Sequence, residues 1–169
     1  MGTLRLTLLR HAHAAPAEAA PDDFLRQLTE RGRREAREVG ERLARAGLVP
    51  ARILASSAQR TRTTAQLAAT ALGLPAAGIT QLDELFNADA QTLWEVLRRE
   101  AGGVRHLLLC AHNPGISRLA SELAAGTGTL PRRIDLPPAG LVTAVWEAPQ
   151  PQWQPLVLTD AQGAEMLLP

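Results

Sequence analysis

Apolar and polar residues follow one another along the chain in two repeating patterns, one typical of strands and one typical of amphipathic helices. Short apolar runs predict strands over Thr3–Leu9, Arg52–Ala55, Ile79–Leu82, His106–Ala111, Leu141–Glu147 and Trp153–Leu158. Apolar residues at every third or fourth position predict helices over Glu30–Ala46, Gln59–Leu72 and Thr92–Glu100, and another from Pro114 onward. This succession of elements favours a mostly parallel central sheet with helices on both faces, a three-layer α/β/α sandwich.

Residues with special backbone or capping properties mark the ends of these elements. Thr29 is expected to cap the first helix, and Gly47 suits its C-terminus. Pro114 fits the first turn of the last helix. Residues 12–27 and 126–138 lack either pattern and are expected to be loops. The prolines between the last two strands suggest a hairpin-like connection, and the residues after 159 show no clear pattern.

The composition narrows the class of protein. The chain has 169 residues, 46% of them hydrophobic, which suits a single globular domain over residues 1–169. A net charge of +1 argues against a nucleic-acid partner. The single cysteine, Cys110, excludes an internal disulfide and is expected to be a buried thiol. No apolar stretch is long enough for a membrane span, and Arg5 and Arg10 interrupt any signal-peptide core, so a cytoplasmic protein with no membrane partner is expected.

Arginine and histidine side chains follow three of the predicted strands. Arg10 and His11 come directly after the first strand, and His112 and Asn113 follow the strand that ends at Ala111. Arg60 lies at the start of the helix that follows the second strand. The carboxyl ends of parallel strands meet at one edge of a sheet, where helix N-termini also favour anions. The sequence therefore predicts a phosphate site at this edge.

A metal site is the alternative use of these histidines. His11 and His13 have a spacing that can chelate a metal, and His112 with an aspartate would complete a metallohydrolase. The chain has only 4 histidines and no further metal-ligand motif, which favours a site without metal or cofactor.

Four motifs follow one another over roughly the first 125 residues. They are Leu8-Leu9-Arg10-His11, Leu28-Thr29-Glu30-Arg31-Gly32, the run from Ser56 to Ala65, and Ala111-His112-Asn113-Pro114-Gly115. Together these motifs resemble those of the histidine phosphatase (phosphoglycerate-mutase-like) superfamily. The segments 23–29, 112–115 and 136–140 resemble the short SixA-type phosphohistidine phosphatases in particular. The resemblance implies a phosphoglycerate-mutase-like fold.

The resemblance also implies roles for the residues at the strand ends. His11 would be the nucleophile that becomes a phosphohistidine, and Arg10, Arg60 and His112 would surround the three equatorial oxygens of the phosphoryl group. A metaphosphate-like transition state needs this kind of charge stabilisation and positioning. Asn113 would add a further substrate contact, and Arg26 would add one at the rim of the pocket. The expected substrate-binding residues are therefore Arg10, Arg26, Arg60, His112 and Asn113.

Two features depart from the family pattern. Ala12 stands where a glycine is usual after the histidine, which puts a positive φ at this position in doubt. The general acid is not fixed by the motifs: Glu84, between Arg60 and His112, is the best placed candidate, and Asp23 in the first loop is the alternative.

The predicted function is that of a metal-independent phosphatase with a phosphohistidine intermediate. About fifty residues separate Arg60 from His112, which leaves little room for a lid and suits phosphohistidine presented on a protein. A small-molecule phosphomonoesterase or mutase is the alternative within the family, and its partner would be a small phosphorylated metabolite. A non-catalytic module that binds a phosphorylated ligand is the alternative outside it, because such a module would keep the arginines without needing an acid.

Overall fold

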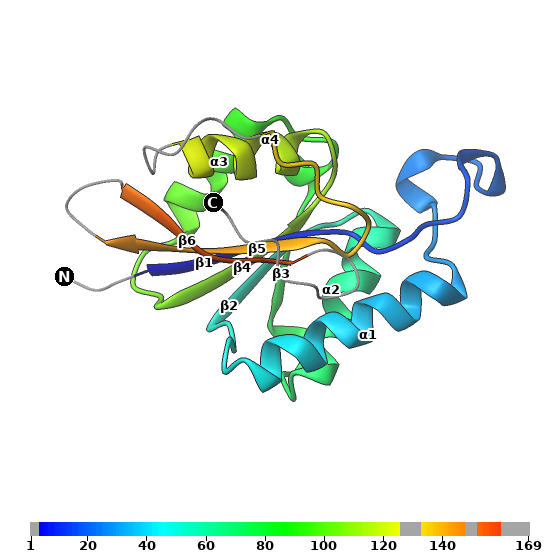
Figure 1. The fold of residues 1–169 in the computed structure, drawn as a ribbon. Coiled ribbons are helices and arrows are strands. Elements are labelled where there is room, and N and C mark those ends of the chain that lie inside the picture. Colours follow the sequence, from blue (N-terminus) through cyan, green and yellow to red (C-terminus); the bar gives the residue numbers. More distant parts are fainter. Residues whose placement is uncertain (1–3, 126–132, 148–151, 160–169) are drawn as a thin grey trace.

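A computed structural model describes residues 4–125, 133–147 and 152–159 (Figure 1). A six-stranded sheet lies at its centre, in the order β3-β2-β4-β1-β5-β6. The strands are β1 (Leu4–Arg10), β2 (Arg52–Ser56), β3 (Ile79–Leu82), β4 (His106–Ala111), β5 (Leu141–Glu147) and β6 (Gln152–Thr159). Strands β1 to β4 pair in parallel, whereas β5 is antiparallel to β1 and to β6. The predicted, mostly parallel sheet is therefore confirmed.

Helices cover both faces of the sheet, as the sequence predicts. They are α1 (Glu30–Arg45), α2 (Gln59–Ala71), α3 (Ala90–Glu100) and α4 (Gly115–Ala125). Helices α1 and α2 lie on one face, and α3 and α4 lie on the other (Figure 1). Short 3-10 helices occur at η1 (Ala17–Ala19), η2 (Asp23–Leu25), η3 (Ala76–Gly78) and η4 (Asp83–Leu85). Among the described residues, no helix combines the length and apolar character needed to cross a bilayer.

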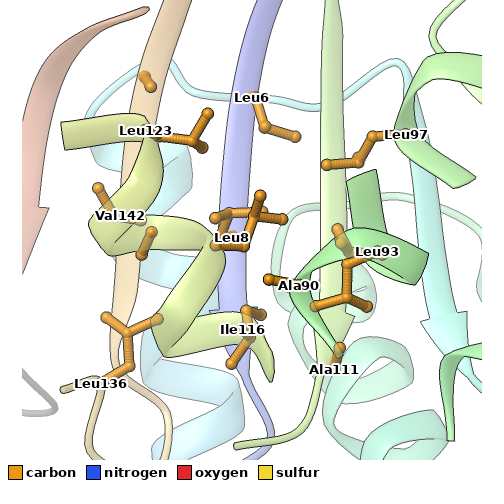
Figure 2. Packing of buried hydrophobic residues seen from close by; sticks show 14 of the residues in the cluster. Leu6, Leu8, Ala90, Leu93, Leu97, Ala111, Ile116, Leu123, Leu136 and Val142 are labelled. Atoms are coloured by element: carbon orange, nitrogen blue, oxygen red, sulfur yellow. The ribbon is translucent and has the colours of Figure 1, made fainter. Parts of the chain in front are cut away.

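The core consists of two clusters, one on each face of the sheet. Leu6 and Leu8 of β1 point toward α3 and α4, where they pack in one cluster with Ile116 (Figure 2). Leu9 belongs to the opposite cluster, with Val39 of α1. This alternation follows from the two-residue period of a strand. Because β1 and β4 are covered on both faces, their carboxyl ends are held rigidly at the centre of one sheet edge.

Two glycines allow elements beside that edge to approach each other closely. Thr29 caps α1, as predicted, by accepting the Gly32 N–H at 3.1 Å. A Cβ on Gly32 would lie 2.0 Å from the backbone oxygen of His13. A Cβ on Gly115, at the start of α4, would lie 1.9 Å from the backbone oxygen of Ala88. Larger residues at these two positions would push the neighbouring backbone away.

Several element boundaries differ from the predicted ones by one or two residues. β1 extends through Arg10 and β2 through Ser56, so both residues lie on strands instead of loops. α3 begins two residues early because Asp89 caps it, accepting the Thr92 N–H at 2.8 Å. Antiparallel pairing of β5 with β6 agrees with the predicted hairpin. The expectations for residues 126–132, 148–151 and 160–169 lie outside the described residues.

Candidate active site

The ends of three strands bring the predicted phosphate-binding residues together. β1 and β4 are neighbours, with Arg10 opposite Ala111, so His11 and His112 emerge side by side. Their ring centroids are 5.2 Å apart, with the ring planes at 61°. Arg60, in the first turn of α2, reaches the same place: its Nε lies 3.3 Å from Nε2 of His11.

The hydrogen bonds of His11 define which ring nitrogen is free to react. Its Nδ1 lies 2.8 Å from the carbonyl oxygen of Ala12, which can only accept, so Nδ1 carries the proton. Nε2 therefore keeps its lone pair, toward which Arg60 Nε donates. Burial lowers the pKa of His11 to about 4, and the charges of Arg60 and Arg10 lower it as well. The imidazole is thus neutral at pH 7, as a nucleophile must be.

Ala12 also shows how the chain tolerates the missing glycine. Among the described residues, the positions with positive φ do not include Ala12. Ala12 is fully buried, and its N–H donates to Oγ1 of Thr64 at 3.1 Å. No glycine is needed for this backbone conformation.

One ring nitrogen of His112 is hydrogen-bonded and the other has no partner among the described residues. Its Nε2 lies 2.9 Å from Oγ of Ser56 and 3.1 Å from Oγ1 of Thr61. Its Nδ1 is buried and has no hydrogen-bond partner among the described residues. Burial lowers the pKa of His112 to about 3, with further lowering by His11 and Arg60. A bound phosphoryl dianion would favour the protonated ring, which then donates from both nitrogens.

Thr61 is not among the site residues predicted from the sequence, although it directly follows Arg60. Neighbours in a helix point in different directions, so the pair of residues does not by itself indicate a shared site. Only the position of His112 at the end of β4 shows that Thr61 faces an imidazole.

Arg60 is held by Asp23 of the first loop. Its Nη2 donates to Oδ2 of Asp23 at 2.9 Å, and its Nη1 donates to the backbone oxygen of the same residue at 2.5 Å. The Arg60 side chain is only 3% exposed. Burial raises the pKa of Asp23. The hydrogen bond and charge of Arg60, together with the charge of Arg26, lower the pKa by more than burial raises it, so the net shift is downward. Asp23 is therefore a carboxylate at neutral pH.

Arg26 and Arg10 both lie close enough to His11 for their charges to lower its pKa. Arg26 forms an ion pair with Asp23 at 3.1 Å, and its charge lowers the pKa of both His11 and His112. Arg10 donates from Nη1 to the carbonyl oxygen of Leu136 at 2.7 Å. Its Nε is buried and lacks a partner among the described residues. Arg10 lies at the end of β1, and the substrate contacts expected of both arginines stay predictions.

The side chain of Asn113 is already engaged by its neighbours. Its Nδ2 lies 3.2 Å from both Oδ1 of Asp135 and the carbonyl oxygen of Leu136, and its Oδ1 accepts from Ser117 at 2.5 Å. The amide is thus tied to the segment before β5 and to α4. These bonds give Asn113 a structural role, and its contact with the substrate stays a prediction.

Glu84 lies apart from the imidazoles. It belongs to η4, and its carboxylate forms a close ion pair with Arg99 of α3. Its side chain is 43% exposed, and no contact within the described part of the chain joins it to His11, Arg60 or His112. This position does not support Glu84 as the general acid. Asp23, the alternative, contacts Arg60 directly.

His13 points away from His11, toward α1. Its Nδ1 lies 2.9 Å from Oγ1 of Thr29, and its backbone N–H donates to Glu35 at 3.0 Å. Across residues 4–125, 133–147 and 152–159, no three His, Cys, Asp or Glu side chains form a group that could hold a metal ion. The geometry therefore gives no support to the metallohydrolase alternative.

Comparison with known proteins identifies the family. The sequence profile of the histidine phosphatase superfamily (branch 1) matches residues 6–101, and the chain belongs to this superfamily. It is accordingly a phosphatase with a phosphoglycerate-mutase-like α/β fold. A comparison with curated proteins finds no match.

Solved structures of SixA proteins resemble this one over most of their length. The putative phosphohistidine phosphatase SixA from Agrobacterium tumefaciens has a TM-score of 0.74 and 28% identity, covering 90% of this chain and 95% of that one. The putative SixA from Nakamurella multipartitia has a TM-score of 0.70 and 25% identity, with 86% of each chain covered. A tungstate complex of the protein histidine phosphatase SixA has a TM-score of 0.70 at 22% identity, covering 96% of this chain and 93% of that one.

Proposed function

We propose that this protein is a metal-independent phosphatase that transfers a phosphoryl group to Nε2 of His11, and that its substrate is phosphohistidine on a protein. The observation that carries the proposal is the state of His11. Its Nδ1 is tied to the Ala12 carbonyl, so a neutral ring offers the Nε2 lone pair beside the Arg60 guanidinium.

The reaction has two displacements at phosphorus. In the first, Nε2 of His11 bonds to phosphorus while the P–N bond to the substrate imidazole breaks, and that imidazole leaves as a neutral ring after protonation. In the second, the oxygen of a water molecule bonds to phosphorus while the bond to Nε2 of His11 breaks; the His11 ring leaves neutral with its proton on Nδ1, and both water protons stay on the phosphate, which leaves as dihydrogen phosphate. Arg10, Arg60 and protonated His112 offset the negative charge on the phosphoryl oxygens in both steps.

The state of Asp23 favours phosphohistidine over a phosphoester. An alkoxide leaving group needs a strong proton donor, whereas an imidazole with its ring protonated does not. The carboxylate that contacts Arg60 is Asp23, whose pKa is lowered, and Glu84 is paired with Arg99. The similarity to SixA proteins over 90% of the chain supports the same substrate class.

A phosphomonoesterase acting on small metabolites is the second candidate. The observation in its favour is the contact of Asp23 with Arg60, because a bound phosphate would compete for that guanidinium. The released carboxylate, now beside an anion, would have a higher pKa and could become a proton donor.

A panel assay tests the proposed function. The purified protein is incubated with a phosphohistidine-carrying protein, an aryl phosphate, and sugar and glycerate phosphates, each with and without a chelator. We expect the highest kcat/KM with phosphohistidine, unchanged by chelation. A metabolite that is turned over faster would overturn the substrate assignment, and activity restored only by a divalent metal would overturn the mechanism.

A matched pair of histidine variants tests the nucleophile. His11→Ala should lower turnover by several orders of magnitude and abolish acid-labile labelling of the enzyme. His13→Ala, two residues away, should retain most of the activity because His13 faces Thr29. Binding of phosphate without turnover by the unaltered protein would instead favour a non-catalytic binding module.

A further inference from the structure

A closed set of hydrogen bonds joins the first turn of α4 to the segment before β5. Ser117 Oγ donates to Oδ1 of Asn113 at 2.5 Å and accepts the Leu136 N–H at 2.9 Å. Nδ2 of Asn113 donates to the carbonyl oxygen of Leu136 at 3.2 Å. The N–H of Leu136 is therefore held by a side chain of α4, and its carbonyl is held by a side chain just before α4.

The same carbonyl oxygen holds Arg10. Nη1 of Arg10 donates to it at 2.7 Å, and this is the one hydrogen bond that the Arg10 side chain forms within the described ranges. The Leu136 side chain is fully buried in the cluster that includes Ile116 (Figure 2). A shift of the Leu136 backbone would therefore move the anchor of the guanidinium.

We propose that Ser117 is a positioning residue for Arg10. Its hydroxyl holds the Leu136 backbone at the point from which the carbonyl aligns the Arg10 guanidinium with the phosphoryl group on His11. The inference rests on the proposed phosphoryl transfer. Only a hydroxyl that both donates and accepts completes the set of bonds, and Ser117 is only 7% exposed, so water has little access to replace it.

Ser121, one helical turn further along α4, provides a matched control. Its Oγ accepts the Ile134 N–H at 2.8 Å and donates to the backbone oxygen of Ser117. It thus fastens the same segment to the same helix, two residues before the carbonyl that holds Arg10. Replacing either serine by alanine should loosen the segment before β5. Only the replacement of Ser117 should change the alignment of Arg10.

Steady-state kinetics on an aryl phosphate and on a phosphohistidine protein give the first measurement. Ser117→Ala should lower kcat about tenfold and leave KM within about twofold, because a misaligned cation weakens transition-state stabilisation more than binding. Ser117→Thr, which keeps the hydroxyl, and Ser121→Ala should both stay within about twofold of the parent. Ser117→Cys keeps the side-chain shape with a slightly larger atom and a weaker hydrogen bond, and it serves as the test variant if Ser117→Ala does not fold.

Double variants decide between positioning and a merely structural role. In an Arg10→Ala background, Ser117→Ala should cause no further loss of kcat, whereas in an Arg60→Ala background the tenfold loss should persist. Equal losses in both backgrounds would overturn the proposal, as would an equal effect of Ser121→Ala. If Arg10→Ala itself leaves turnover unchanged, the proposed function fails instead, which separates the two conclusions.

Discussion

Replacing Asp23 by asparagine removes one negative charge from the site without changing the shape of the side chain. Asp23 contacts Arg60 Nη2 at 2.9 Å, and its own side chain is 40% exposed. Arg60 is only 3% exposed, so removing the opposite charge beside it should cost about 1–3 kcal/mol of stability, although the asparagine oxygen can still accept from Arg60. Rates are therefore compared per folded molecule, as measured by circular dichroism, so that the remaining change in rate reflects the chemistry.

The expected change in rate depends on the leaving group. A carboxylic acid that protonates a poor leaving group contributes about 10²- to 10⁴-fold to the rate. If phosphate displaces Asp23 from Arg60 and the freed carboxyl takes up a proton, Asp23→Asn should lower kcat for an alkyl phosphate by at least about 10²-fold. With phosphohistidine the loss should stay within about threefold, because the leaving imidazole is protonated on its own ring.

The assay compares three substrates in order of leaving-group basicity: an alkyl phosphate, an aryl phosphate and a phosphohistidine protein. Glu84→Gln is the matched carboxylate control and should leave all three rates unchanged, since Glu84 is paired with Arg99. An equal loss on all three substrates with Asp23→Asn would refute the reasoning and indicate that Asp23 only orients Arg60. A substrate-selective loss with Glu84→Gln would return the general-acid role to Glu84.

Two further predictions concern the framework around the site. Burial lowers the pKa of His11 and His106 to about 4 and of His112 to about 3, whereas a histidine in an unfolded chain has a pKa near 6.5. At a pH between the folded and the unfolded pKa, the unfolded state therefore binds more protons than the folded state. The free energy of unfolding is therefore highest above about pH 6.5 and falls toward pH 4, by about 2 kcal/mol per histidine between pH 7 and 5. Urea titrations that give the same unfolding free energy across this range would contradict the assignment. Gly32→Ala places a Cβ 2.0 Å from the His13 backbone oxygen, so it should cost about 1–3 kcal/mol of stability and much of the activity. Gly102→Ala, the control, meets nothing within 4 Å. If the two variants melt at the same temperature by circular dichroism, the close contact at Gly32 is relieved by a local shift.

The sequence predicted the residues that lie at strand ends because two simple rules locate them. Apolar runs mark the buried strands, and parallel strands bring their carboxyl ends to one edge. Arg10, His11 and His112 are placed by these rules alone, and Arg60 follows from the helix that begins just after β2. Backbone topology is sufficient for this part of the site, which explains why a pattern read without a structure locates four charged or imidazole side chains within one small region.

Residues that act through loop conformation are not accessible to the same rules. The contact of Asp23 with Arg60 depends on η2, a single 3-10 turn within a segment that has no hydrophobic period. Glu84 has a suitable position in the sequence, yet η4 turns its carboxylate toward Arg99. In both cases one short turn decides whether the carboxylate contacts Arg60, and no periodic pattern encodes its direction.

The alignment of Arg10 combines both kinds of information. Its backbone is placed by β1, but its guanidinium is aligned by the Leu136 carbonyl, which lies 126 residues further along the chain. The backbone N–H of the same Leu136 donates to Ser117, which the sequence shows only as one polar position on an amphipathic helix. The strand end thus supplies the cation and a distant helix supplies its direction, so the strength of the phosphate site depends on packing between elements that the sequence pattern treats as independent.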